Sequence, residues 1–170
     1  MAKSYPDIGT FTAGQVLTAA TMNDVGTNLD NFRVPASCSV YFGTATTYTQ
    51  DTDIAWTAQD YTNTDSMWTS GATVTIGTAG LYLVTFSGRA TSTTSAGARA
   101  AILFSSTTTD LQGQEQNTTD FRWSVSAVRS LAAASTLTAR LQWSGSGTVT
   151  LQGASDLRPT LTATWLGQVA

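Results

Sequence analysis

From Ala36 onward the chain is a succession of short runs rich in β-branched and aromatic residues, separated by clusters of Gly, Ser, Thr, Asn and Asp. β-branched side chains fit a pleated, half-buried surface, and the intervening clusters are typical of turns. We expect strands near residues 38–46, 54–57, 66–70, 72–77, 80–90, 97–105, 120–130, 136–144, 147–152 and 159–167. Many short strands without a long helix between them predict an all-β fold, either a sandwich or a jelly roll.

The composition supports this fold class. Charged residues make up only 11% of the chain, less than half the usual share of about 25%. Lys3 and Glu115 are the only lysine and glutamate, the residue types that solubilise exposed helices, and Thr and Ser are abundant in their place. A length of 170 residues is enough for one domain with a small appendage.

Apolar residues alternate with polar ones in two of the expected strands. They are Leu137, Ala139, Leu141 and Trp143 in the strand 136–144, and Phe121, Trp123 and Val125 in the strand 120–130. The run 81–86 is different, because it is apolar at both odd and even positions and should be covered on both faces. An isolated two-sheet sandwich leaves one face of each sheet exposed to water. We therefore expect a second copy of the chain to cover this strand, with the flat sheet packed around a threefold axis.

Residues 1–35 are unlike the rest, and we divide the chain into an N-terminal arm (1–35) and a β domain (36–170). Thr18 is placed to cap a helix, and Leu17 and Met22 have the spacing of a hydrophobic staple. An apolar stripe recurs at intervals of three and four residues until Pro35, formed by Met22, Val25, Leu29 and Phe32. Gly26 and several Thr and Asn weaken this short helix, so it should need a partner surface.

Several function classes are excluded by what the chain lacks. It contains no histidine, which removes Ser-His-Asp and Cys-His catalysis and the commonest metal ligand. Cys38 is the only cysteine, so we expect a buried free thiol and no structural zinc. The net charge is −3 and the arginines form no basic stripe, so nucleic acid is not an expected partner. The N-terminus lacks the apolar core of a signal peptide and no apolar run has membrane-spanning length, so we expect synthesis in the cytoplasm and no membrane partner.

Two features could still carry chemistry. The pairs Asp51/Asp53 and Asp60/Asp65 could bind Ca²⁺ or serve a glycosidase, but Asx residues in Thr-rich loops more often bond their own backbone. The tryptophans could form a sugar-stacking platform, but Trp123, Trp143 and Trp165 lie among alternating strand residues, which favours packing. Trp68, beside a turn, is the one expected to be an exposed ligand contact. We therefore predict no catalytic, cofactor or metal site.

Five stretches of the β domain together resemble the C1q/tumour-necrosis-factor-like (C1q/TNF-like) jelly rolls. They are residues 61–68 (YTNTDSMW), 74–76 (VTI), 79–86 (AGLYLVTF), 131–141 (LAAASTLTARL) and 161–167 (LTATWLG). The resemblance spans about residues 36–167 and implies a homotrimer. It places Tyr82, Val84 and Phe86 inside the sandwich, and it implies a trimer interface formed by Leu81, Leu83 and Thr85.

The segment Phe11–Asn23 (FTAGQVLTAATMN) resembles the opening of many tailed-bacteriophage structural proteins. The resemblance implies a place on the virion and a role for the arm in attachment. The residues expected to make this attachment are Phe11, Val16, Leu17, Met22, Val25, Leu29 and Phe32.

The leading hypothesis is a non-enzymatic minor capsid protein, a homotrimeric jelly-roll knob that decorates the phage head and binds the major capsid protein through its arm. It would be made in the host cytoplasm and lie on the capsid exterior. The chain is short and has no shaft repeat, which favours decoration over a tail fibre. Two alternatives stay open: a tail-fibre or tail-tip module that binds host glycans through Trp68, and a carbohydrate-active enzyme that uses the Asp pairs.

Overall fold

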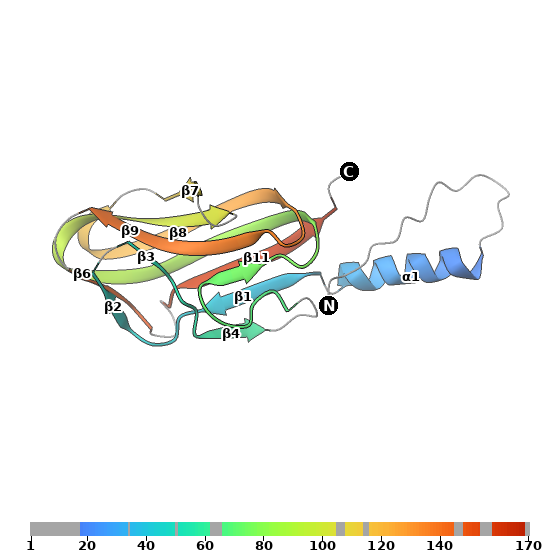
Figure 1. Ribbon diagram of the computed structural model, residues 1–170, viewed down its shortest axis with the longest axis horizontal. Coiled ribbons are helices and arrows are strands. Elements are labelled where there is room, and N and C mark those ends of the chain that lie inside the picture. The colour runs from blue at the N-terminus through green and yellow to red at the C-terminus, as the bar shows by residue number, and fades with distance from the viewer. Residues whose placement is uncertain are drawn as a thin grey trace.

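The computed structural model describes residues 18–33, 35–49, 51–61, 66–104, 108–113, 116–144, 148–153 and 158–168. It contains one helix, α1 (Ala19–Arg33), and the strands β1 (Ser37–Tyr41), β2 (Thr46–Tyr48), β3 (Thr52–Asp53), β4 (Ala58–Tyr61), β5 (Thr73–Thr75), β6 (Gly80–Phe104), β7 (Thr108–Gln112), β8 (Gln116–Leu131), β9 (Thr136–Ser144), β10 (Val149–Leu151) and β11 (Thr160–Gly167). The strands form a sandwich, and α1 projects from the end of it at which β1 begins (Figure 1). The predicted jelly-roll class is confirmed.

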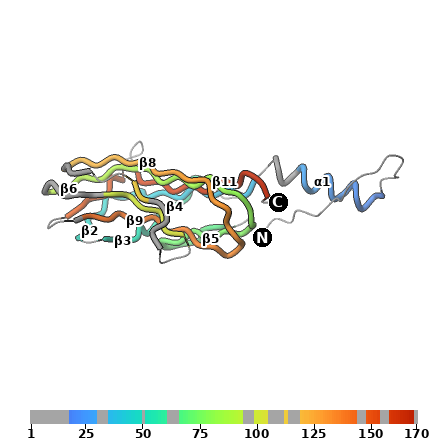
Figure 2. The backbone as a smooth tube through the Cα atoms, turned by 90° about the horizontal axis from the view of Figure 1, so that it is seen from above, coloured from blue at the N-terminus to red at the C-terminus, as the bar shows by residue number. Residues whose placement is uncertain are grey.

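The long strand β6 joins the two layers of the sandwich. Its first part, residues 80–91, pairs with β8 on one side and with β11 on the other. β1 pairs with β11, and β4 pairs with β1, so this sheet has the order β4-β1-β11-β6-β8. The second part of β6 pairs with β9 and β7, and β9 in turn pairs with β3 and β5. Figure 2 shows β8 and β11 in one layer and β9, β3 and β5 in the other.

The core lies between these two layers and is built from the inward positions of each strand. Tyr82, Val84 and Phe86 of β6 are fully buried, as predicted, and they face buried residues of β9 such as Leu137. The Phe86 ring contacts two indoles, edge-on to Trp56 with ring centroids 6.2 Å apart and tilted to Trp123 at 5.3 Å. The predicted alternation is therefore confirmed, because the apolar face of each strand lies in this core.

Several strand boundaries differ from the sequence-based expectation. The expected strand 38–46 is two strands, because β1 pairs with β11 whereas β2 pairs with β10. The expected strands 80–90 and 97–105 are one continuous strand, β6. Residues 66–70 form no strand, and of residues 54–57 only Trp56 makes a bridge, to Gly71. β7 was not predicted, because its sequence TTDLQ is mostly polar, although it pairs with the neighbouring end of β6.

Helix α1 begins as the sequence predicts. The hydroxyl of Thr18 accepts a hydrogen bond from the backbone N–H of Thr21 at 3.2 Å, the geometry of an N-cap. The stripe points away from the sandwich core, since Met22 is 52% exposed and Leu29 is 60% exposed. Phe11, Val16, Leu17 and the side chain of Phe32 lie outside the described residues. The role of the arm in attachment, like the division of the chain at residue 35, stays a prediction.

Cys38 is buried in β1 as expected, and burial raises the pKa of its thiol to about 11. We predict that a disulfide-exchange reagent at pH 8 modifies Cys38 only when the protein unfolds, because the thiolate is the nucleophile. The raised pKa also means that stability from the neutral thiol is present below about pH 9 and is lost as the pH rises through about 11. The absorbance of the group released from the reagent, recorded with and without denaturant, measures how fast Cys38 is labelled. Rapid labelling of the native protein would contradict the prediction.

Candidate interaction face

The outward surface of the sheet β4-β1-β11-β6-β8 is the most distinctive surface of the described residues. Alternation along β6 directs Tyr82 and its inward neighbours to the core, so Leu81, Leu83 and Thr85 point to the opposite side. Leu83 is 39% exposed, and Leu81 and Thr85 are half-buried. Among the described residues, no element covers the second apolar side of this strand at Leu83.

The strand register extends this apolar surface beyond β6. Leu83 lies directly opposite Val128 of β8 on one side and Thr164 of β11 on the other, and residues that pair in this way share a face. Leu166 is the extra residue of a bulge in β11, and both it and Val128 are 49% exposed. We call Leu81, Leu83, Val128 and Leu166 the apolar patch.

Sequence reasoning identified Leu81 and Leu83 but missed the other two members of the apolar patch. A signal for Val128 was present, because it occupies an outward position in the alternation set by Phe121, Trp123 and Val125. No comparable signal marks Leu166, since its direction depends on the bulge in β11.

The row next to Leu83 carries hydroxyl groups and no charge, whereas further along β6 Arg89 lies opposite Arg122 of β8 and pairs with Asp120 at 2.6 Å. Thr85 lies opposite Ser126 of β8 and Thr162 of β11, and Thr162 lies opposite Ser39 of β1. Hydroxyl groups can exchange water for partners on another protein surface, whereas an unpaired charge would be costly to bury. The row next to Leu83 can therefore be covered without leaving an isolated charge.

A charged cluster lies at the margin of the face, on β4 and just before β11. The guanidinium of Arg158 donates to a carboxylate oxygen of Asp60 and lies 3.7 Å from the centre of the Tyr41 ring. The other oxygen of Asp60 accepts a hydrogen bond from the Ser39 hydroxyl at 3.1 Å. Asp65, the expected partner of Asp60 in a cation or catalytic pair, lies outside the described residues. Asp60 thus joins the loop before β11 to strands β1 and β4.

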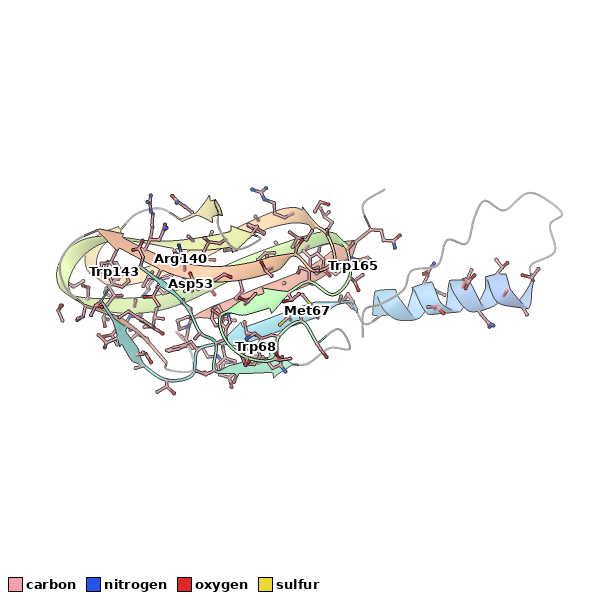
Figure 3. The ribbon with its side chains drawn as sticks, in the orientation of Figure 1. Asp53, Met67, Trp68, Arg140, Trp143 and Trp165 are labelled. Carbon is pink, nitrogen blue, oxygen red and sulfur yellow. The ribbon has the colours of Figure 1, made fainter. Side chains whose placement is uncertain are left out.

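The second pair of carboxylates holds β3 against β9. Asp53 accepts a hydrogen bond at 2.6 Å from Arg140, which raises the pKa of that guanidinium (Figure 3). Asp51 accepts the backbone N–H of Trp143 at 3.0 Å. Across the described part of the chain, no three Asp, Glu or Cys side chains gather as a metal site would require. Both carboxylates bond groups of β9 and not their own backbone, so the turn-capping role expected for this pair is wrong.

The tryptophans are dispersed through the sandwich rather than gathered on one surface. Trp56 and Trp165 are buried, and Trp123 and Trp143 pack partly buried against the core. Trp68 is half-buried and its indole N–H donates to the Gly71 carbonyl at 3.0 Å. Figure 3 places Trp68, Trp143 and Trp165 in separate regions. Trp68 also packs against the core, and its role as an exposed ligand contact stays a prediction.

The arrangement of strands can be compared with proteins of known structure. No protein-family model matches the sequence, and no curated protein matches it. The globular domain of zebrafish complement 1qA superposes with a TM-score of 0.52 and 10% identity, over 78% of this chain and 98% of that one. Murine APRIL gives a TM-score of 0.54 and 12% identity, over 77% of this chain and 100% of that one. Eiger TNF from S. frugiperda gives 0.52 and 13%, over 79% and 94% of the two chains.

The fold is that of the C1q/TNF-like jelly rolls. The resemblance read from the sequence motifs is thus confirmed for the fold of the β domain. At these identities the likeness concerns the fold alone, because jelly rolls host many functions. Within the described residues, α1 lacks the length and the apolar character of a membrane-crossing helix.

Proposed function

We propose that the protein is a non-enzymatic structural module that assembles as a homotrimer through the face bearing the apolar patch. The observation that carries this proposal is the exposed Leu83–Val128 pair on strands whose opposite sides form the core. A sheet with apolar side chains on both faces is stable in water when a second protein surface covers it. The C1q/TNF-like fold agrees with self-association.

The apolar patch is small, so the proposed interface should involve the whole outward face of the sheet. Covering a half-exposed Leu or Val contributes about 1 kcal/mol, so the patch alone gives a modest contribution per chain. The uncharged hydroxyl row beside it provides further area that can be buried. In a threefold arrangement each chain contributes two contact surfaces, so the contributions of three chains add in one assembly.

We also propose that the trimer decorates the head of a tailed bacteriophage, where the arm attaches it to the major capsid protein. The resemblance of Phe11–Asn23 to the opening of virion proteins supports this assignment, as does the projection of α1 from one end of the sandwich. Three arms on one trimer would bind a lattice with avidity, so no single arm needs a strong contact. The protein would lie on the capsid exterior after synthesis in the host cytoplasm.

The experiment that tests attachment removes residues 1–33 and mixes the truncated protein with capsids that lack it. We expect a folded trimer that no longer cosediments with the capsids, because the anchor is missing while the β domain is complete. The matched control is Thr27→Asp in the full chain, on the polar side of α1, which should still bind. Normal occupancy by the truncated protein would show that the β domain itself contains the anchor.

Imaging of labelled particles separates decoration from the tail-tip alternative. Decoration predicts label over the head surface. Label at the tail tip would instead favour the glycan-binding module, and Trp68→Ala should then reduce binding to host cells. Label at neither place would contradict the virion assignment.

A further inference from the structure

We propose that the α1 helices of three copies pack together as a parallel three-stranded coiled coil at the end of the sandwich. The proposal rests on the proposed trimer and assigns an occupant to the exposed stripe of α1. The structural observation behind it is that β1, the strand that follows α1 in the chain, begins in the same row of the sheet as Leu83 and Val128.

The spacing of the stripe is that of a coiled-coil seam. Met22, Val25 and Leu29 are separated by three and then four residues, and Phe32 continues the spacing in the sequence. Two apolar positions in seven define a narrow seam with Met22 and Leu29 at heptad position a and Val25 at position d. A helix that packed on a globular surface would show a broader apolar face.

The residue types at the seam favour more than two strands. Parallel dimers prefer a β-branched residue at a and Leu at d, whereas α1 has unbranched Met22 and Leu29 at a and β-branched Val25 at d. Of the positions that flank the seam, Thr21, Gly26 and Asn28 are uncharged, and a charge enters only with Arg33 at the last residue of α1. Fifteen residues containing Gly26 are too few for a stable isolated helix in water.

The sheet face fixes where the helices would meet. Ser37, the first residue of β1, lies in one row of the sheet with Thr164, Leu83 and Val128. Neighbouring strands are about 4.8 Å apart, so β1 begins about 10 Å from Leu83. The backbone carbonyl of the buried Ala36 accepts a hydrogen bond from the backbone N–H of Trp165 at 2.9 Å. This bond fixes the chain three residues after α1 ends.

A trimer that meets through the apolar patch therefore brings three helix ends together in the same orientation. Figures 1 and 2 both show α1 running outward along the long axis of the sandwich from this end. Tethering of this kind converts helix pairing into an intramolecular step at an effective concentration in the millimolar range. A marginal helix can then form a stable coiled coil, which would hold the three N-terminal segments at one point.

The test is disulfide cross-linking in the full chain. Val25→Cys at the seam should give covalent dimers under mild oxidation about tenfold faster than Thr27→Cys on the exposed side of α1, because d positions of adjacent helices approach within disulfide reach. Both variants retain Cys38, so its buried thiol contributes equally. Adding Leu29→Asp to Val25→Cys should abolish the rapid cross-link while the sheet face maintains the trimer.

The outcomes distinguish the coiled coil from the trimer. Equal rates for Val25→Cys and Thr27→Cys, in a protein with the mass of a trimer, would overturn the coiled coil and leave the proposed trimer intact. A monomeric mass without cross-linking would overturn both. Rapid cross-linking that persists with Leu29→Asp would also overturn the coiled coil, since an Asp in the seam should break it.

Discussion

We expect Gly80→Ala to lower the free energy of unfolding of the β domain by about 3 to 5 kcal/mol, the sum of backbone strain and overpacking. Gly80 begins β6 with a φ of +155°, which side chains rarely adopt. A Cβ there would lie 2.1 Å from the indole nitrogen of Trp165 and 2.6 Å from the Gly167 carbonyl oxygen. Trp165 is buried and donates to the Ala79 carbonyl at 3.3 Å, so it cannot move aside without losing packing and this bond.

Urea denaturation followed by tryptophan fluorescence measures this loss. The matched control is Gly26→Ala, because a Cβ at Gly26 meets no atom within 4 Å and Ala favours a helix. The control should leave the midpoint of the β domain unchanged. A midpoint for Gly80→Ala equal to that of the unaltered protein would contradict the close approach of Gly80 to Trp165.

The second large effect is expected at the interaction face. Leu83→Asp should weaken trimer formation by about 100-fold to 1000-fold, because it places an unpaired charge at a contact surface at a cost of about 3 to 4 kcal/mol. The monomer should stay folded, since Leu83 is 39% exposed in the single chain and lies outside the core. The apolar patch would then be exposed on a soluble, folded β domain.

Sedimentation velocity over a range of concentrations, together with the thermal midpoint, checks this prediction. Thr73→Asp is the matched control, because Thr73 is exposed on β5, which belongs to the other layer. It should remain a trimer. Unchanged association of Leu83→Asp would place the subunit contact elsewhere, and an unfolded Leu83→Asp chain would show that the residue supports the fold instead.

Local sequence signals predicted the elements whose own residues carry a regular apolar pattern. β9 has the predicted limits 136–144, and α1 begins after the predicted cap at Thr18. β9 has a strict alternation of apolar residues, and α1 combines regular apolar spacing with a local capping hydrogen bond. β3 was missed because its hydrogen bonds are made to β9, which is distant in sequence. β7 pairs with the neighbouring end of β6 but was missed because its mostly polar sequence carries no apolar pattern.

The interaction face could be predicted only in part for the same reason. The two-sided run 81–86 showed that one side of β6 needs a cover, and Leu83 is exposed there. That Val128 lies beside Leu83 follows from the register between β6 and β8, which the sequence alone does not define. The partner of Asp53 is likewise Arg140, 87 residues away, so the structural role of that carboxylate emerges only from the pairing of β3 with β9.

The most direct test of the account is the mass of the unaltered protein in solution at micromolar concentration, measured by light scattering after size-exclusion chromatography. We predict a single species of three times 17.8 kDa, with the sheet faces that bear the apolar patch packed around a threefold axis. A species of 17.8 kDa under these conditions would contradict the account, because the exposed Leu83–Val128 pair would then lack the second protein surface proposed to cover it.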